Sequence, residues 1–499
     1  MKDLSSLPDA HLRIFDRPAP PDPADIRDIY LIGICGTGMG SLAGLLQQAG
    51  YQVRGSDEAA YPPMSVRLAE MGIEVIEGFD PANLEPAPDL IIVGNSCTPR
   101  HPEASYAREQ GLPQLSFPEA LHHFFLRDRR SLVVAGTHGK TTTTGLLAHV
   151  LRWNDLQPGV MVGGVMRNHN VSYDVGQPPY FVVEGDEYDS AYFDKQPKMM
   201  HYAPHSAIIT SMEFDHADIY DDWDDYREAF RRFAAIVPPE GMLALNSDHE
   251  EVRELSRHTQ ARVRYFGTTD EADVTARNVR AGSGGQRFDL IVDGAKAAEV
   301  FFPMNGHHNL LNVLAVCTIA LDEGVDPERL AEGIAYFRGM KRRQEIRGEA
   351  SGVLIIDDFA HHPTAVRETV RAVAERWPER RVVAVFEPRS NSSRRKIFES
   401  AYAESFDGAA SVFLSSPPLR HNDRADDLLD PLRVVDRLER SGISASTHVN
   451  ADAMLPGLLT AVKPGDVVLI MSNGGFGNIQ ARLLEALEDR ERSLGMPVR

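Results

Sequence analysis

The most informative stretch of the sequence is Ser131-Leu132-Val133-Val134-Ala135-Gly136-Thr137-His138-Gly139-Lys140-Thr141-Thr142-Thr143-Thr144. Its apolar beginning, rich in β-branched residues, predicts a buried strand over 132–135. The helical spacing of leucine and valine further on predicts a helix that begins at Lys140. A strand, a loop with glycine at both ends and a helix N-terminus form a cradle for an anion, because the loop N–H groups and the helix dipole point at one spot.

Each polar group of this cradle has an expected role in binding ATP. Lys140 would lie against the β/γ-phosphate and Thr141 would offer its hydroxyl to Mg²⁺. A standard phosphate loop has glycine six positions before the lysine, where this sequence has Val134, so the loop is a compact variant. The alternative is a threonine-capped loop that binds no nucleotide, but a cap has no need of Lys-Thr after the glycine. The predicted ATP-binding residues of this loop are Gly136, Thr137, His138, Gly139, Lys140, Thr141 and Thr142.

The bulk composition sets limits on the class of protein. A chain of 499 residues has room for about three domains. A formal charge of −20 and a pI near 5.4 argue against nucleic acid or an anionic membrane as the main partner. The three cysteines are far apart, which indicates a reducing compartment and excludes a cysteine-rich zinc site. With no leader and no apolar run of about 18 residues, the expected location is the cytoplasm.

A second glycine-rich loop comes earlier in the chain. A strand beginning at Asp28 runs into 33–41, which contains four glycines, and a helix and a second strand follow. This is a dinucleotide-type unit, with Asp57 about 20 residues on, where an acid could meet a ribose hydroxyl. Ser96 follows another strand, and strand ends carry ligand contacts in this kind of sheet. By itself the unit also fits an NAD-dependent dehydrogenase. The predicted nucleotide-sugar contacts are Gly36, Thr37, Gly38, Met39, Asp57 and Ser96.

Acidic residues follow two further predicted strands. Glu184 comes directly after Phe181-Val182-Val183, where a carboxylate could share Mg²⁺ with Thr141. Asp186, Glu187 and Asp189 are expected to be solvated loop acids. His216 follows the strand 207–210 and is flanked by acids, so a role with metal or phosphate is as plausible as a structural one.

The rest of the chain adds polar groups at helix starts and strand ends. Asn309 and Asn312 share one helix face, where amides can read an adenine edge, although asparagine is also a common cap. Arg342 and Arg343 lie in a basic hinge over 337–343, and a third α/β unit begins near residue 340. Its strand ends carry Asp358, the basic loop 387–395 and the glycine-rich loop 472–478.

These motifs, taken in order, resemble the Mur ligase family over about 28–480. The residues that carry the resemblance are Gly33 to Ser41, Gly136 to Thr142, Glu184, Asp215-His216, His308-Asn309 with Asn312, Arg342-Arg343, and Asp358 with His361-His362-Pro363. The resemblance implies an α/β fold with a Rossmann-like UDP-binding domain over 28–128, a P-loop ATPase domain over 129–338 and a Rossmann-like domain over 339–499. Residues 1–27 are expected to form an extended arm without chemistry.

Within the family, Tyr188, Phe193 and the loops 387–392 and 471–476 resemble the branch that attaches a recycled peptide. The implied reaction joins UDP-N-acetylmuramate to L-alanyl-γ-D-glutamyl-meso-diaminopimelate through an acyl phosphate, with ATP and Mg²⁺, during recycling of peptidoglycan. The branch that adds free L-alanine is the nearest alternative. A nucleotide-gated binding protein without ligase chemistry is another.

The resemblance also implies a role for each candidate residue. Lys140, Glu184, His216, Arg342 and Arg343 would be catalytic, and Thr141, Glu184 and His216 would hold the metal. Asn309 and Asn312 would hold the adenine, Asp358 the ribose of ATP, and Arg389, Ser390 and Asn391 the peptide. The oligomeric state is not predicted.

Overall fold

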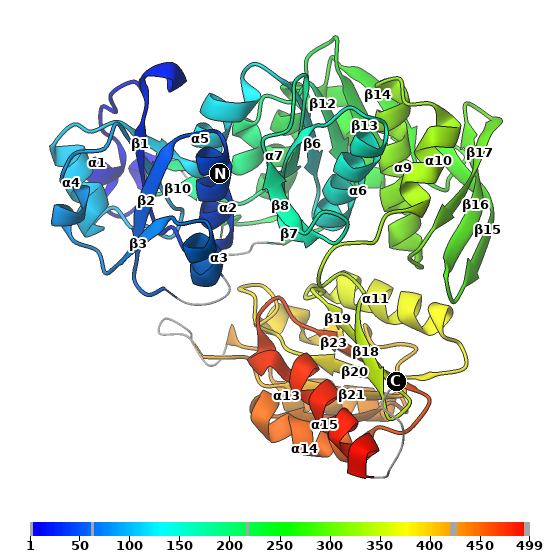
Figure 1. The fold of residues 1–499 in the computed structure, drawn as a ribbon. Helices are drawn as coiled ribbons and strands as arrows, with labels where there is room; N and C mark the ends of the chain where they lie inside the picture. The colour runs from blue at the N-terminus through cyan, green and yellow to red at the C-terminus, as the bar shows by residue number, and fades with distance from the viewer. Residues whose placement is uncertain (1–2, 61–63, 216–218, 420–426, 494–499) are drawn as a thin grey trace.

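The fold is described on a computed structural model, for residues 3–60, 64–215, 219–419 and 427–493. Three large sheets follow one another along the chain, each within one of the three predicted domain ranges. In Figure 1 the first two α/β units lie side by side and the third lies below them. The predicted three-part α/β architecture is confirmed.

The first sheet is parallel and has five strands. Their order is β3 (Glu74–Glu77), β2 (Gln52–Asp57), β1 (Asp28–Ile32), β4 (Leu90–Val93) and β5 (Gln114–Ser116). The helices are α2 (Thr37–Gln48), α3 (Met64–Glu70), α4 (Pro102–Glu109) and α5 (Phe117–Leu121). The prediction of an extended N-terminal arm is wrong, because short helical turns at Leu4–Ser6, Ala10–Arg13 and Pro23–Asp25 interrupt it.

The central sheet places the phosphate-loop strand between two strands that end in polar loops. Its order is β17 (Ala295–Phe302), β16 (Gly285–Val292), β15 (Val274–Gly282), β14 (Arg262–Phe266), β13 (Met242–Asn246), β12 (Ser206–Ile209), β6 (Arg130–Ala135), β9 (Tyr180–Gly185), β7 (Gly159–Met166) and β8 (Val171–Asp174). Because β6 runs parallel to both β12 and β9, the loops after these three strands meet at one edge. The main helices here are α6 (Lys140–Trp153), α7 (Trp223–Ala235), α9 (His307–Asp322) and α10 (Pro327–Ala335).

The third sheet has an antiparallel edge strand and five parallel strands. The order is β18 (Glu345–Ala350), β19 (Val353–Asp358), β23 (Asp466–Met471), β20 (Arg381–Phe386), β21 (Ser411–Ser415) and β22 (Ser444–His448). The helices are α11 (Pro363–Arg376), α12 (Glu399–Ala403), α13 (Pro431–Arg440), α14 (Ala451–Ala461) and α15 (Ile479–Ser493).

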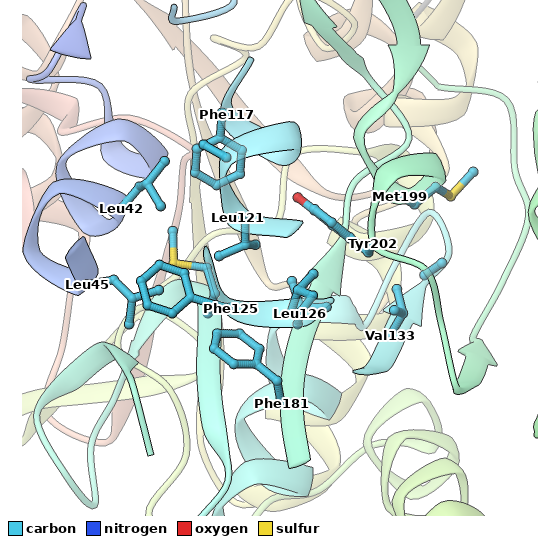
Figure 2. Packing of buried hydrophobic residues seen from close by; sticks show 14 of the residues in the cluster. Leu42, Leu45, Phe117, Leu121, Phe125, Leu126, Val133, Phe181, Met199 and Tyr202 are labelled. Atoms are coloured by element: carbon cyan, nitrogen blue, oxygen red, sulfur yellow. The ribbon is translucent and has the colours of Figure 1, made fainter. Parts of the chain in front are cut away.

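One apolar cluster joins the first unit to the second. Figure 2 shows Leu42 and Phe117 from the first unit packed in the same cluster as Phe181, Met199 and Tyr202 from the second. A continuous buried core of this kind fixes the two units against each other. Across the part of the chain that the structure describes, no helix has the length and apolarity needed to cross a bilayer.

Candidate active site

The phosphate loop joins β6 to α6 through backbone conformations that glycine supplies. Gly136 has φ of 132° and Gly139 has φ of 81°, a region that other residues rarely adopt. A Cβ atom at Gly139 would lie 2.4 Å from Asn312 Oδ1, so the side chain of Asn312 closes one side of the loop. The strand, loop and helix predicted from the sequence are therefore present, with α6 starting at Lys140.

Lys140 is held inside this loop by a buried carboxylate. Its Nζ atom donates to Gly136 O at 2.6 Å and to Glu187 Oε2 at 2.8 Å. The prediction that Glu187 is a solvated loop acid is wrong, because this residue is only 1% exposed. Burial lowers the pKa of Lys140, but the carboxylates of Glu187 and Asp186 raise it more, so the pKa lies above its ordinary value. Lys140 therefore carries a full charge where a phosphate would bind.

Thr141 and Glu184 lie in direct contact, as their predicted sharing of a metal requires. Thr141 Oγ1 donates to Glu184 Oε1 at 2.8 Å, and Glu184 Oε2 accepts from Gly163 N at 2.7 Å. Burial and neighbouring Asp186 raise the pKa of Glu184. Space here is limited, since a Cβ atom at Gly164 would lie 2.9 Å from Thr141 Cγ2. Thr142 is buried in the first turn of α6.

The two hinge arginines contact different units of the protein. Arg343 Nη2 donates to Thr141 Oγ1 at 3.1 Å, which brings a guanidinium to the phosphate loop. Arg342 Nη2 instead donates to Gly474 O at 2.7 Å, in the third unit. Of the two predicted catalytic arginines, the structure therefore brings Arg343 alone to the loop.

The hinge is fixed by Asp358, for which an ATP ribose contact was predicted. The buried carboxylate of Asp358 accepts from the backbone N–H groups of Gln344 and Ala360, both at 2.7 Å. Arg342 and Gln344 have φ of 58° and 47°, so the chain turns sharply on both sides of Arg343. The structure thus gives Asp358 a role in holding the turn that presents Arg343.

The two predicted adenine-binding amides are used inside the protein. Asn312 Oδ1 accepts from Thr143 Oγ1 at 3.1 Å, and Asn309 Nδ2 donates to Asn305 O at 2.8 Å. Both side chains are buried, Asn309 at 2% and Asn312 at 5% exposed. The structure therefore does not place them on an open adenine-binding surface. It makes Asn312 a support of the phosphate loop.

The first glycine loop leaves backbone open where a pyrophosphate was predicted. Gly36 and Thr37 are exposed at the N-terminus of α2, and Ser96 is exposed nearby, with its Oγ atom 3.8 Å from the Cβ position of Gly33. The carboxylate of Asp57 is hydrogen-bonded within the protein, because its Oδ2 atom accepts from Cys35 N at 2.8 Å. The structure thus places Asp57 as a brace of the loop that would hold the ligand.

The other two predicted contacts of this loop are partly covered. Gly38 lies under the ring of Phe117, whose Cε2 atom is 3.6 Å from the Cβ position of the glycine. Met39 is buried at 7% exposed. Gly36, Thr37 and Ser96 are therefore the predicted residues most open to a nucleotide sugar, while Gly38 and Asp57 are half-buried.

The predicted peptide loop lies at the end of β20. Arg389 and Asn391 are exposed, and Ser390 Oγ donates to Ser393 Oγ at 2.8 Å. Ser392 in the same loop donates through its hydroxyl to Asp215 of the central unit. The loop therefore lies where the central and third units meet.

Three family models match the chain in sequence. They are the "Mur ligase family, catalytic domain" over 28–129, the "Mur ligase middle domain" over 134–320 and the "Mur ligase, glutamate ligase domain" over 342–474. The chain belongs to the Mur ligase family. It is accordingly an ATP-dependent ligase that forms an amide bond, and the dehydrogenase alternative is wrong.

Relatives of known name match almost the whole chain of this Mur ligase. A protein of Escherichia coli (strain K12) named "UDP-N-acetylmuramate--L-alanyl-gamma-D-glutamyl-meso-2,6-diaminoheptandioate ligase" is 39% identical and covers 92% of this chain and 98% of its own. A "UDP-N-acetylmuramate--L-alanine ligase" of Rhizobium johnstonii is 33% identical, with coverages of 93% and 98%. The crystal structure of a murein peptide ligase from Psychrobacter arcticus superposes with a TM-score of 0.70 at 32% identity, and covers 93% of this chain and 99% of that one.

The residues of this Mur ligase fit the Mg²⁺ that members of the family in general use. A hydroxyl and a carboxylate lie in contact beside the phosphate-loop lysine, and both are oxygen ligands of the kind that Mg²⁺ prefers. Thr141 and Glu184 would hold the ion together with phosphate oxygens. His216, the third predicted ligand, lies outside the described residues.

Sequence reasoning missed a polar cluster that connects the central unit of this ligase to the third. Glu213 Oε2 accepts from Thr364 Oγ1 at 2.7 Å and lies 3.3 Å from His138 Nε2 and 3.6 Å from His362 Nδ1. Burial opposes ionisation of Glu213, but the histidines and Thr364 lower its pKa to about 2. Burial lowers the pKa of His362 to about 4. The available signal was that His138 and Glu213 follow the neighbouring strands β6 and β12 of the central sheet, and that His362 follows β19 of the third sheet.

Proposed function

We propose that this Mur ligase joins UDP-N-acetylmuramate to L-alanyl-γ-D-glutamyl-meso-diaminopimelate, and so returns recycled peptide to peptidoglycan synthesis. Two relatives named for that reaction, from E. coli and Haemophilus influenzae, are 39% and 36% identical over 465 residues. The L-alanine ligase of R. johnstonii, which matches over 98% of its own length, is 33% identical. The observation that carries the chemistry is the convergence of Lys140, the Thr141–Glu184 pair and Arg343 at one loop.

The first step activates the carboxylate of the sugar nucleotide. A carboxylate oxygen attacks the γ-phosphorus of ATP, the bond from that phosphorus to the bridging oxygen breaks, and ADP leaves. Lys140 neutralises the phosphate oxygens that it faces once it leaves Glu187, and Arg343 adds a second positive charge beside Thr141. A bound Mg²⁺ supplies further neutralisation of the phosphates.

The second step forms the amide bond. The uncharged α-amine of the peptide attacks the acyl carbon, the tetrahedral intermediate expels inorganic phosphate, and the amine nitrogen loses a proton. Two anions and an amine must meet, so the protein contributes mainly position and charge. We propose that the exposed Gly36–Thr37 turn takes the UDP pyrophosphate and that Arg389, Ser390 and Asn391 take the peptide carboxylates.

A panel of acceptors tests this assignment. ADP release is measured with UDP-N-acetylmuramate, Mg-ATP and either the tripeptide or free L-alanine. The proposal expects rapid turnover with the tripeptide and little with L-alanine. The reverse preference would assign the protein to the L-alanine branch, and ADP release that needs no acceptor would contradict ligase chemistry. Lys140→Ala is expected to lower turnover by orders of magnitude while binding of UDP-N-acetylmuramate survives.

A further inference from the structure

A buried lysine outside the phosphate loop lies at the limit of ion-pair distance from a carboxylate. Lys198 begins the 3-10 helix η5 (Lys198–His201), and its side chain is only 9% exposed. Among the residues that the structure describes, its Nζ atom has one carboxylate neighbour, Asp186 Oδ2 at 4.0 Å, which is beyond hydrogen-bond distance. A buried ammonium without a bonded anion is unfavourable. The site therefore lacks an acceptor that a ligand could supply.

Two aromatic rings surround this ammonium. Lys198 Nζ lies 4.8 Å from the centre of the Phe117 ring and 4.2 Å from that of Tyr188. Ring faces attract a cation but donate no lone pair in the way an anion does. Burial lowers the pKa of Lys198, while the carboxylates of Asp186, Asp189 and Glu184 oppose that effect. The described residues around Lys198 thus hold a positive charge in place, and none of them accepts a hydrogen bond from its Nζ atom.

The position of Lys198 connects the two substrate regions. On one side, the ring of Phe117 also covers Gly38 in the first glycine loop, with Cε2 at 3.6 Å from the Cβ position. Figure 2 shows Phe117 in the apolar cluster that contains Met199, the residue after Lys198. On the other side, Asp186 follows Glu184 by two residues, and both carboxylates act on the pKa of Lys140 as well as on that of Lys198. Lys198 therefore lies between the predicted pyrophosphate loop and the predicted Mg-ATP site.

We propose that the Lys198 ammonium binds the carboxylate of the sugar nucleotide and holds it toward the γ-phosphate of ATP. This inference rests on the proposed function, because the sugar nucleotide must then span the distance between the two loops. Its pyrophosphate lies at the first glycine loop, and its carboxylate reacts at the phosphate loop. A lysine that donates to one carboxylate oxygen leaves the other free to attack. The opposing interpretation is that Asp186 and the two rings keep Lys198 as a purely structural cation.

A pair of ligands that differ by one carboxylate separates these interpretations. UDP-N-acetylglucosamine lacks the lactyl ether of UDP-N-acetylmuramate and therefore its carboxylate. Binding of both to the full chain is measured by calorimetry, without ATP, for the unaltered protein and for Lys198→Met. We expect the unaltered protein to prefer the muramate form by about tenfold and Lys198→Met to lose that preference, with the affinity for UDP-N-acetylglucosamine unchanged within about twofold. A preference that survives in Lys198→Met would overturn the proposal.

A neighbouring lysine provides the matched control. Lys195 pairs with Asp189, so Lys195→Met removes the same charge three residues away and is expected to keep the preference. Loss of the preference in this control would show a general charge effect and overturn the proposal. Failure of the unaltered protein to bind UDP-N-acetylmuramate would instead refute the proposed function.

A structure of the unaltered protein with UDP-N-acetylmuramate decides the matter even if Lys198→Met does not fold. A lactyl carboxylate oxygen within about 3.2 Å of Lys198 Nζ supports the proposal. A carboxylate held by other residues, with Lys198 still between its two rings, overturns it.

Discussion

Glu187 forms a buried ion pair with the phosphate-loop lysine that was not predicted from the sequence. Its carboxylate binds Lys140 at 2.8 Å in a buried site, so it occupies the partner position that a phosphate must take. We predict that Glu187→Gln lowers the free energy of unfolding by about 3 kcal/mol without nucleotide, because it leaves a buried charge without its partner. Saturating Mg-ATP should restore part of this loss, since phosphate oxygens then bind Lys140. Urea unfolding with and without Mg-ATP measures both effects.

A double variant provides the control for Glu187. Lys140→Met combined with Glu187→Gln removes both members of the pair, and we expect it to be more stable than the sum of the single changes indicates. Simple additivity would contradict a direct interaction.

The sequence could not reveal this pair, because Glu187 stands among other acids in a polar loop. Its burial depends on residues distant in sequence, such as Tyr220, whose hydroxyl donates to Glu187 O.

The strand β7 limits the space around the predicted metal pair. A Cβ atom at Gly164 would lie 2.9 Å from Thr141 Cγ2, so Gly164→Ala should push Thr141 away from Glu184. We predict a fall in kcat of about a hundredfold, because displacement by a fraction of an ångström disturbs the alignment on which catalysis depends, together with a higher Mg²⁺ concentration for half-maximal rate. Initial rates of ADP release over a Mg²⁺ series measure both quantities.

Gly284→Ala is the matched control for β7. Gly284 lies in the turn between β15 and β16, and a Cβ atom there meets nothing within 4 Å. This variant should keep the unaltered rate and Mg²⁺ dependence. An unchanged Mg²⁺ dependence in Gly164→Ala would show that β7 does not set the geometry of the pair.

The sequence predicted the elements around the phosphate loop better than their contacts. Apolar runs followed by glycine and polar residues located β6, β9 and α6, because these patterns are local. The roles expected for Asn309 and Asp358 depended on which partner each side chain meets. Asn305 and Gln344 are those partners. Asn305 lies just before α9 and Gln344 lies in the hinge, and apolar patterns do not show which side chain meets their backbone groups.

At the scale of the whole molecule, the third unit docks on the central one through side chains that titrate. His362 lies at the N-terminus of α11 and faces Glu213, His138, His361 and Asp215. Burial lowers the pKa of His362 to about 4 from an ordinary value of 6.5, so the docked state favours the uncharged ring. Protons therefore bind the separated state more strongly between pH 6.5 and 4. In the docked state Glu213 stays ionised through this range, because its pKa there is about 2.

We accordingly predict that docking is complete above pH 6.5 and weakens by roughly 3 kcal/mol as the pH falls to 4. Small-angle X-ray scattering should show a larger radius of gyration at pH 5 than at pH 7.5, with unchanged far-UV circular dichroism. His362→Asn removes the titrating ring but can still accept from Thr364 N, as His362 does at 3.3 Å. This variant should expand less over the same pH range, because His361 alone of the adjacent pair still titrates. An equal expansion in both proteins would assign the pH dependence to other groups.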